Sequence, residues 1–136
     1  MKIIALKGRH DCGKSETLGI HLRELLTGRP VDQSEWWKVK DKRESIAYEE
    51  KMIDLCPPGD TEDIVLANIA FFEAHPCEVA FTATRTRGKG CNALEKFAKK
   101  AGAKLVWIWK DYNDDLDKVG QTEANKTLAQ ELFEMI

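Results

Sequence analysis

The stretch from Gly8 to Ser15, which reads G-R-H-D-C-G-K-S, limits the possible folds of this chain more than any other part of its sequence. It follows residues 2–7, a short apolar run rich in isoleucine that is typical of a buried parallel strand. It precedes a predicted helix that Gly28 and Pro30 end. The apolar face of that helix is formed by Leu18, Leu22, Leu25 and Leu26. A strand, a glycine loop and a helix in this order predict the first unit of an α/β fold.

The residue types in this loop suit a phosphate group. Gly8 and Gly13 permit backbone angles and a close approach that a Cβ would block, so successive N–H groups can curl around an anion. Lys14 supplies a mobile positive charge for the β- and γ-phosphates, and the Ser15 hydroxyl is a suitable ligand for Mg²⁺. The positive end of the helix dipole adds to the same site. The residues expected to bind the nucleotide are Gly8, Arg9, His10, Asp11, Cys12, Gly13, Lys14, Ser15 and Glu16.

Length and composition argue against several classes of protein. The 136 residues fit one domain, residues 1–136, without a linker or repeat. A formal net charge of -2 leaves no global basic footprint, which argues against nucleic acid as the main partner but leaves a local basic patch open. No apolar run approaches the ~20 residues needed to span a bilayer, so no membrane partner is expected. The four cysteines show neither C-x-x-C nor zinc-ligand spacing, and no signal peptide precedes the first strand. We therefore expect reduced thiols and a cytoplasmic location.

The rest of the chain alternates between predicted strands and helices. Residues 35–40 predict a peripheral strand, and the short runs 45–49 and 51–56 predict an antiparallel hairpin that leads into the core. Together they place a β-hairpin region at about residues 35–56 of a mainly parallel central sheet. The remaining elements are helices at about 61–75, 92–101 and 122–136, and strands at 78–84 and 105–109, the last of them buried on both sides.

The segment I-D-L-C-P-P-G-D at residues 53–60 contains two acidic residues. An acid after an apolar strand that lies beside the first strand can hold Mg²⁺ through a water molecule. Asp54 is the first candidate for this acid and Asp60 is the second. Asp60 also fits the N-terminal cap and acidic first turn of the helix that follows, and both interpretations of Asp60 remain open.

A basic loop, Arg85 to Gly90, follows the strand at residues 78–84. Ligands of open α/β sheets collect at the carboxyl ends of the strands, so this loop is expected at the same edge as the glycine loop. Arg85 and Arg87 project to one side of an extended backbone, where they could clamp phosphate oxygens. With Lys14 they are the candidate catalytic residues, because they could stabilise the charge of a transferring phosphoryl group. The alternative interpretation is that the loop from Arg85 to Gly90 is a solvated turn without a functional role.

These motifs make the chain resemble the P-loop NTPase superfamily. The resemblance implies a three-layer α/β fold that binds ATP or another nucleoside triphosphate together with Mg²⁺. The run Ile53 to Gly59 is similar to the Walker B segment of the MinD/ParA/Mrp ATPases, but Arg9 stands where that group carries its signature lysine. Asn125-Lys126-Thr127-Leu128 is a near miss for the guanine-reading N-K-x-D pattern of GTPases, so guanine specificity has no support.

Three functions fit these observations. The first is an Mg²⁺-dependent nucleoside-triphosphate binding protein, most simply an ATPase. The second is a small-molecule or nucleotide kinase in which the Arg85 to Gly90 loop acts as a lid. The third is a non-enzymatic switch that presents Trp36, Trp37 and the hairpin to a protein partner. The base preference and the destination of the γ-phosphate stay open at this stage.

Overall fold

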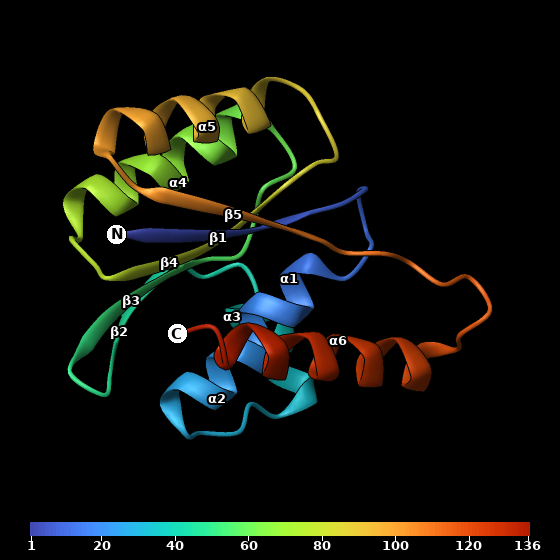
Figure 1. Cartoon of the computed structure of the whole chain (residues 1–136). Helices are drawn as coiled ribbons and strands as arrows, with labels where there is room; N and C mark the ends of the chain where they lie inside the picture. Colours follow the sequence, from blue (N-terminus) through green and yellow to red (C-terminus); the bar gives the residue numbers. More distant parts are fainter.

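One five-stranded sheet organises the computed structural model, which describes all 136 residues (Figure 1). The strands are β1 (Lys2–Lys7), β2 (Glu44–Tyr48), β3 (Lys51–Cys56), β4 (Val79–Thr84) and β5 (Lys104–Trp109). Their spatial order is β2-β3-β4-β1-β5, with β2 antiparallel to β3 and every other pair parallel. The α/β class, the mainly parallel sheet and the antiparallel hairpin are thus confirmed, although the hairpin covers residues 44–56 rather than 35–56.

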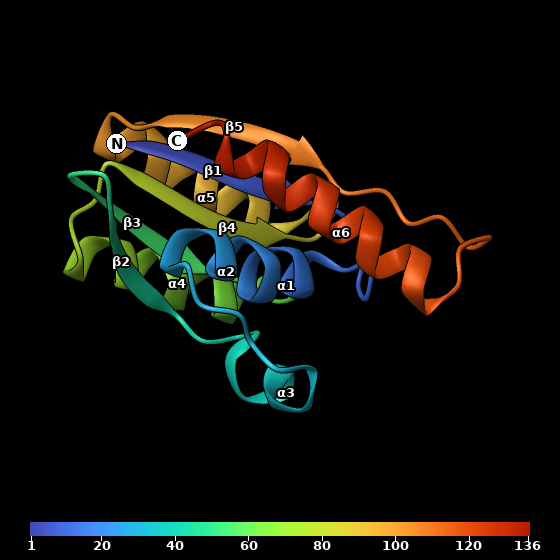
Figure 2. The same ribbon diagram turned by 90° about the horizontal axis from the view of Figure 1, so that it is seen from below.

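Helices cover both faces of this sheet, which gives three layers (Figures 1 and 2). One face carries α4 (Glu62–Ala74) and α5 (Lys89–Ala101), which pack side by side. The other face carries an unbroken helical run and α6, with two short helical turns beyond the run. These segments are α1 (Lys14–Glu16), a π-helical stretch (Thr17–Leu22), α2 (Arg23–Thr27), a 3₁₀ turn (Gln33–Glu35), α3 (Trp36–Val39) and α6 (Lys118–Phe133).

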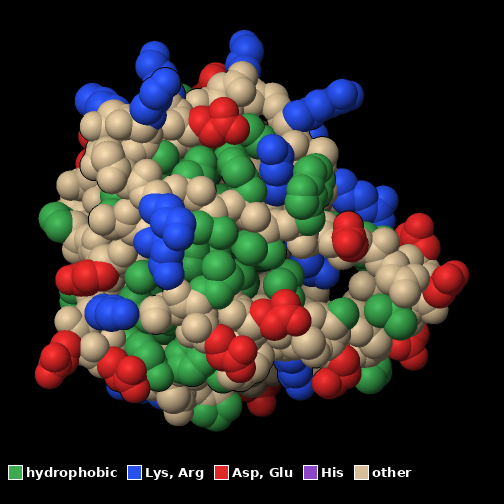
Figure 3. Space-filling view, in the orientation of Figure 1, with side chains coloured by type: hydrophobic (Ala, Val, Ile, Leu, Met, Phe, Trp, Pro, Cys, Tyr) green, Lys and Arg blue, Asp and Glu red, His purple; other side chains and the backbone are tan.

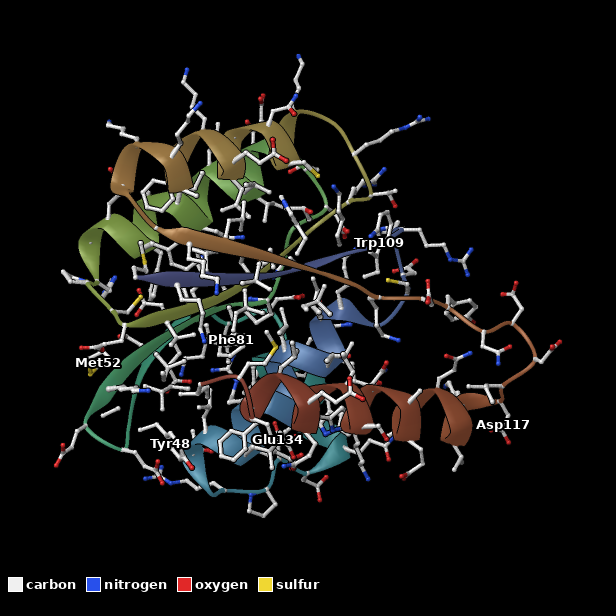
Figure 4. All side chains as sticks on the ribbon, in the orientation of Figure 1. Tyr48, Met52, Phe81, Trp109, Asp117 and Glu134 are labelled. Atoms are coloured by element: carbon white, nitrogen blue, oxygen red, sulfur yellow. The ribbon has the colours of Figure 1, made fainter.

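The sheet separates two apolar cores. On the side of α6, Phe81 of β4 is completely buried and belongs to the same cluster as Leu22 and Leu132 (Figure 4). On the opposite side, Ile3 of β1 clusters with Leu94 of α5. Each such side chain contributes ~1.5–3 kcal/mol on burial, so apolar residues on both faces of β1 and β4 fix these strands at the centre of the sheet.

Residues 33–39 are helical, so the expectation of a strand at residues 35–40 is wrong. Asp32 caps the segment: its Oδ1 accepts a hydrogen bond from the Ser34 N–H at 2.9 Å, and its carbonyl accepts one from the Glu35 N–H at 2.8 Å. Trp36 Nε1 donates to the Val31 carbonyl at 3.1 Å, which holds the turn against the preceding chain. Local side-chain capping therefore makes this segment helical, although its alternation of large and charged residues would also suit a strand.

β5 is an edge strand, because it pairs only with β1. Its side chains are half-buried or exposed, and Trp109 is 58% exposed, which corrects the expectation of a strand buried on both sides. Figure 3 views the molecule from the side on which β5 lies, and apolar side chains are visible in the middle of this face. Trp109 lies at the end of the strand (Figure 4).

Candidate functional site

The glycine loop lies at the carboxyl end of β1, between the ends of β4 and β5. The Gly8 N–H donates to the Thr84 carbonyl at 3.3 Å, and a Cβ on Gly8 would lie 2.7 Å from the carbonyl oxygen of Lys110. The backbone then turns through left-handed angles, with φ of 57° at Asp11 and 99° at Gly13. These two turns curl the loop back onto α1, which begins at the next residue.

Lys14 lies inside this curl. Its Nζ donates to the carbonyl of Gly8 at 2.6 Å and to that of Arg9 at 2.9 Å, and the residue is only 5% exposed. Burial lowers the pKa of the Lys14 ammonium, while the negative charge of Asp60 opposes that effect. A buried ammonium that is held by two carbonyls attracts anions more strongly than a solvated lysine does.

A cavity of about 430 Å³ opens over the loop. It brings together Lys14, Ser15 and Asp60, which the sequence had placed in one site, and adds Lys40 and Asp41, which sequence reasoning had missed. The complete lining is Asp11, Cys12, Gly13, Lys14, Ser15, Glu16, Lys40, Asp41, Pro58, Asp60 and Ile64. Three segments that are distant in sequence therefore share one polar cavity.

Arg9 and His10 contribute to the loop but do not line this cavity. The Arg9 guanidinium lies over the ring of Tyr112, 4.3 Å from its centroid, and Arg9 Nη2 is 3.5 Å from Asp114 Oδ1. His10 Nδ1 lies 3.1 Å from Asp60 Oδ2. The Arg9 side chain thus fastens the loop to the segment after β5, and His10 holds the carboxylate of Asp60 beside the loop.

α6 braces the loop from the other side. Asn125 packs so closely on Gly13 that a Cβ there would lie 2.7 Å from Asn125 Oδ1. Asn125 Nδ2 donates to Glu16 Oε2 at 2.8 Å, and His21 Nε2 lies 2.9 Å from the same oxygen. Burial alone would raise the pKa of Glu16, but the hydrogen bonds from His21 and Asn125 lower it. Asn125 therefore holds the ionised Glu16 and the loop. It lies inside α6, within the helix that the sequence predicts at about residues 122–136.

Asp54 does not reach the cavity, which corrects its assignment as the first choice of metal ligand. β4 lies between β3 and β1, so Asp54 pairs with Ala80, and Ala80 in turn pairs with Ile3 near the start of β1. The Asp54 side chain is completely buried, and Ser45 Oγ donates to its Oδ1 at 2.7 Å. Burial raises the pKa of this carboxyl group. Asp54 is thus an interior acid at the far end of the strands.

Arg85 and Arg87 lie at the same sheet edge as the loop but line a different cavity, of about 240 Å³. Asp60 lines both cavities, so the two are neighbours. Because neither arginine contributes to the lining of the larger cavity, its charges come from Lys14, Lys40 and the carboxylates.

Arg23 positions the Lys40 and Asp41 wall of the larger cavity. Its Nε donates to the Gly19 carbonyl at 2.8 Å, and its Nη2 donates to the carbonyls of Val39 at 3.1 Å and Lys42 at 2.6 Å. The guanidinium also pairs with Glu44. Gly19 lies in the π-helical stretch, and a Cβ there would lie 1.7 Å from the carbonyl oxygen of Lys40. This close approach packs residues 39–42 directly on the helix that follows the loop.

The carboxylates that line the cavity do not converge on one point as the ligands of a metal ion would. No group of three or more His, Cys, Asp or Glu side chains is arranged to hold one. A cation bound here could use the Ser15 hydroxyl and the Asp60 carboxylate, with water and phosphate oxygens as its other ligands. Mg²⁺ fits this donor set, because it binds oxygen and retains several waters.

No helix of the structure has both the length and the apolarity needed to span a membrane. Comparison of the chain with protein-family models, curated proteins and solved structures finds no match.

Proposed function

We propose that this chain is an Mg²⁺-dependent nucleoside-triphosphate binding protein with ATPase activity. The observation that carries the proposal is the buried Lys14 ammonium inside a glycine loop, at the carboxyl end of β1 and beside a 430 Å³ polar cavity. Strand, loop and helix follow one another in the order that phosphate-binding loops require. The volume of the cavity suits a polyphosphate chain rather than a single small ion.

The proposal assigns roles to the loop, to three lining residues of the cavity and to His10 beside it. The loop N–H groups and Lys14 hold the phosphates, and Lys14 neutralises the charge that develops when the terminal phosphoryl group leaves. The Ser15 hydroxyl and the Asp60 carboxylate would hold Mg²⁺, which would supply positive charge to offset that of the phosphates. His10 orients Asp60, because its Nδ1 lies 3.1 Å from Asp60 Oδ2.

The kinase interpretation is the second candidate. The observation that favours it is the smaller cavity beside Asp60, which would offer room for an acceptor group if the terminal phosphate lay near Asp60. The proposed switch function would use the exposed side chain of Trp37, which is 73% exposed, as a contact for a partner. The three functions differ in where the γ-phosphate goes.

Lys14→Ala tests the proposal. A charge-assisted hydrogen bond contributes ~1.5–3 kcal/mol, so the affinity for Mg·ATP should fall by about 10- to 100-fold. Binding is measured by fluorescence with a labelled ATP analogue and by competition with the four unlabelled triphosphates, which also reveals the base preference. Lys96→Ala is the matched control, because it removes an exposed lysine that makes no ion pair from the side of α5 remote from the loop.

Equal affinities of wild type and Lys14→Ala would refute the proposed site. Turnover is followed with γ-labelled ATP and a pool of nucleoside monophosphates. Label in inorganic phosphate indicates an ATPase, label in an acceptor indicates a kinase, and binding without release of label indicates a switch.

A further inference from the structure

A second polar cavity, of about 240 Å³, lies between the turn before α4 and the loop before α5. Both segments follow strands at the carboxyl edge of the sheet, next to the glycine loop (Figure 1). The lining residues are Gly59, Asp60, Thr61, Glu62, Arg85, Arg87, Lys89, Gly90 and Cys91. The cavity is too small for a nucleoside but large enough for a phosphate or carboxylate group with a few attached atoms.

The charges of this cavity are divided between its two walls. Arg85, Arg87 and Lys89 form one wall, and none of them makes an ion pair with a carboxylate. Asp60 and Glu62 lie on the opposite wall, and Asp60 is already engaged by His10. These three exposed cations give the cavity a positive wall without ion-pair partners, and a bound anion would neutralise part of that charge.

The backbone around the cationic wall is held in place. Cys91 Sγ contacts the Arg85 carbonyl oxygen at 3.1 Å and Thr84 Oγ1 at 3.4 Å, which ties the first turn of α5 to the end of β4. Gly88 turns the chain into α5 with φ of 116°, an angle that favours glycine. A Cβ on Gly90 would lie 3.0 Å from Val65 Cγ2, so this turn packs directly on α4. The three cations therefore project from an anchored turn rather than from a free loop.

We propose that this cavity is a second anion-binding site, which takes the phosphate or carboxylate group of a small molecule while a nucleotide occupies the glycine loop. Arg85 and Arg87 are the anion's main ligands because guanidinium groups match the geometry of such oxyanions, and Lys89 adds charge. Asp60 faces both cavities, so the two ligands would meet at this residue. The simultaneous occupancy rests on the proposed function, whereas the anion site itself does not.

Amide NMR of the full chain tests the site, with inorganic phosphate as the probe and acetate as the carboxylate probe at matched ionic strength. Phosphate or acetate should shift the amides of residues 85–91, both in the free protein and in the presence of saturating Mg²⁺ and a non-hydrolysable ATP analogue. The double variant Arg85→Gln/Arg87→Gln should lower the affinity at least tenfold. Lys96→Gln/Lys99→Gln, which removes two exposed cations of the same helix, should stay within twofold of wild type.

Two results would overturn the proposal. One is that the ions shift only the amides of residues 8–16 and are displaced by the analogue, which means a single site. The other is that the arginine double variant binds the ions as well as the lysine double variant does. Preference for phosphate or for acetate supports the site and identifies its ligand class. If the ATP analogue fails to bind, the proposed function fails, but the titration of residues 85–91 still decides on the anion site.

Discussion

Asp54→Asn should leave the Mg²⁺ dependence of nucleotide binding within twofold of wild type, whereas Asp60→Asn should weaken Mg²⁺ binding in the nucleotide complex by about 10- to 100-fold. The pairing register of the strands gives the distance between Asp54 and the glycine loop. Asp54 lies level with Ile3, and the loop begins at Gly8, five residues later along β1. At ~3.3 Å per residue the separation is about 16 Å, far beyond the ~2.1 Å of a direct Mg²⁺ ligand or the reach of one water.

Asp54→Asn should also change how the free energy of unfolding depends on pH. Burial raises the folded-state pKa of Asp54, so folding favours the protonated carboxyl group. The stability that the Asp54 carboxyl group contributes to the fold is fully present below the unfolded-state pKa of about 3.9, and it is lost as pH rises through the folded-state pKa. Each unit of upward pKa shift costs ~1.4 kcal/mol at neutral pH. Asparagine does not ionise, so Asp54→Asn should gain stability relative to wild type as pH rises.

Both effects are measurable with the same protein samples. Mg²⁺ is titrated against a fixed concentration of labelled nucleotide for wild type, Asp54→Asn and Asp60→Asn, and urea unfolding is recorded at several pH values between 4 and 8. In Asp54→Asn the new amide group keeps an oxygen that can accept the Ser45 hydrogen bond, so the fold should persist. Loss of Mg²⁺ dependence in Asp54→Asn, with retention in Asp60→Asn, would contradict the register argument. A pH-independent stability difference would contradict the assigned pKa direction.

Two further predictions concern the packing that shapes the larger cavity. Gly59→Ala should destabilise the fold by ~3 kcal/mol or more in urea unfolding, because its Cβ would lie 1.9 Å from the Ala83 carbonyl oxygen. Gly28→Ala is the control: with φ of 68° but open space around it, it should cost only about 1 kcal/mol, and equal costs would refute the steric argument. Arg23→Lys should cost ~3–5 kcal/mol, because one ammonium cannot replace a guanidinium that bonds Glu44 and three carbonyls; a loss below about 1 kcal/mol would contradict this role.

Local sequence signals predict most of the elements. The helix expected at about residue 61 begins where Thr61 Oγ1 accepts a hydrogen bond from the Ile64 N–H at 3.2 Å, and the hairpin pairs Ile46 with Ile53 as alternation requires. The strand predicted at residues 35–40 is wrong because the capping signal, Asp32 followed three residues later by Glu35, outweighs strand-like alternation. Both signals are present in the sequence, and the nearer hydrogen bonds determine the structure.

The order of strands is what local periodicity cannot supply. Asp54 and Asp60 lie on one short segment, and which of them reaches the glycine loop depends on β4 inserting between β3 and β1. The edge position of β5 has the same origin: an apolar run is compatible with a central or an edge strand until its neighbours are known. Lys40 and Asp41 reach the cavity through contacts of Arg23 and Gly19, residues about twenty positions earlier in the chain.

The charges of the larger cavity support the proposal that a divalent cation accompanies the nucleotide. Four carboxylates line it against two ammonium groups, those of Lys14 and Lys40. Hydrogen bonds from His21 and Asn125 stabilise the ionised form of Glu16, and Asp60 Oδ2 lies 3.1 Å from His10 Nδ1, but all four carboxylates still add negative charge to the cavity. A free triphosphate would add several negative charges to this excess, and like charges in a partly desolvated cavity repel strongly. In the proposed complex Mg²⁺ would offset this negative charge beside Asp60, while Lys14 would hold the phosphates on the loop side. The proposed requirement for Mg²⁺ thus rests on the charge of the cavity as a whole rather than on one acidic residue.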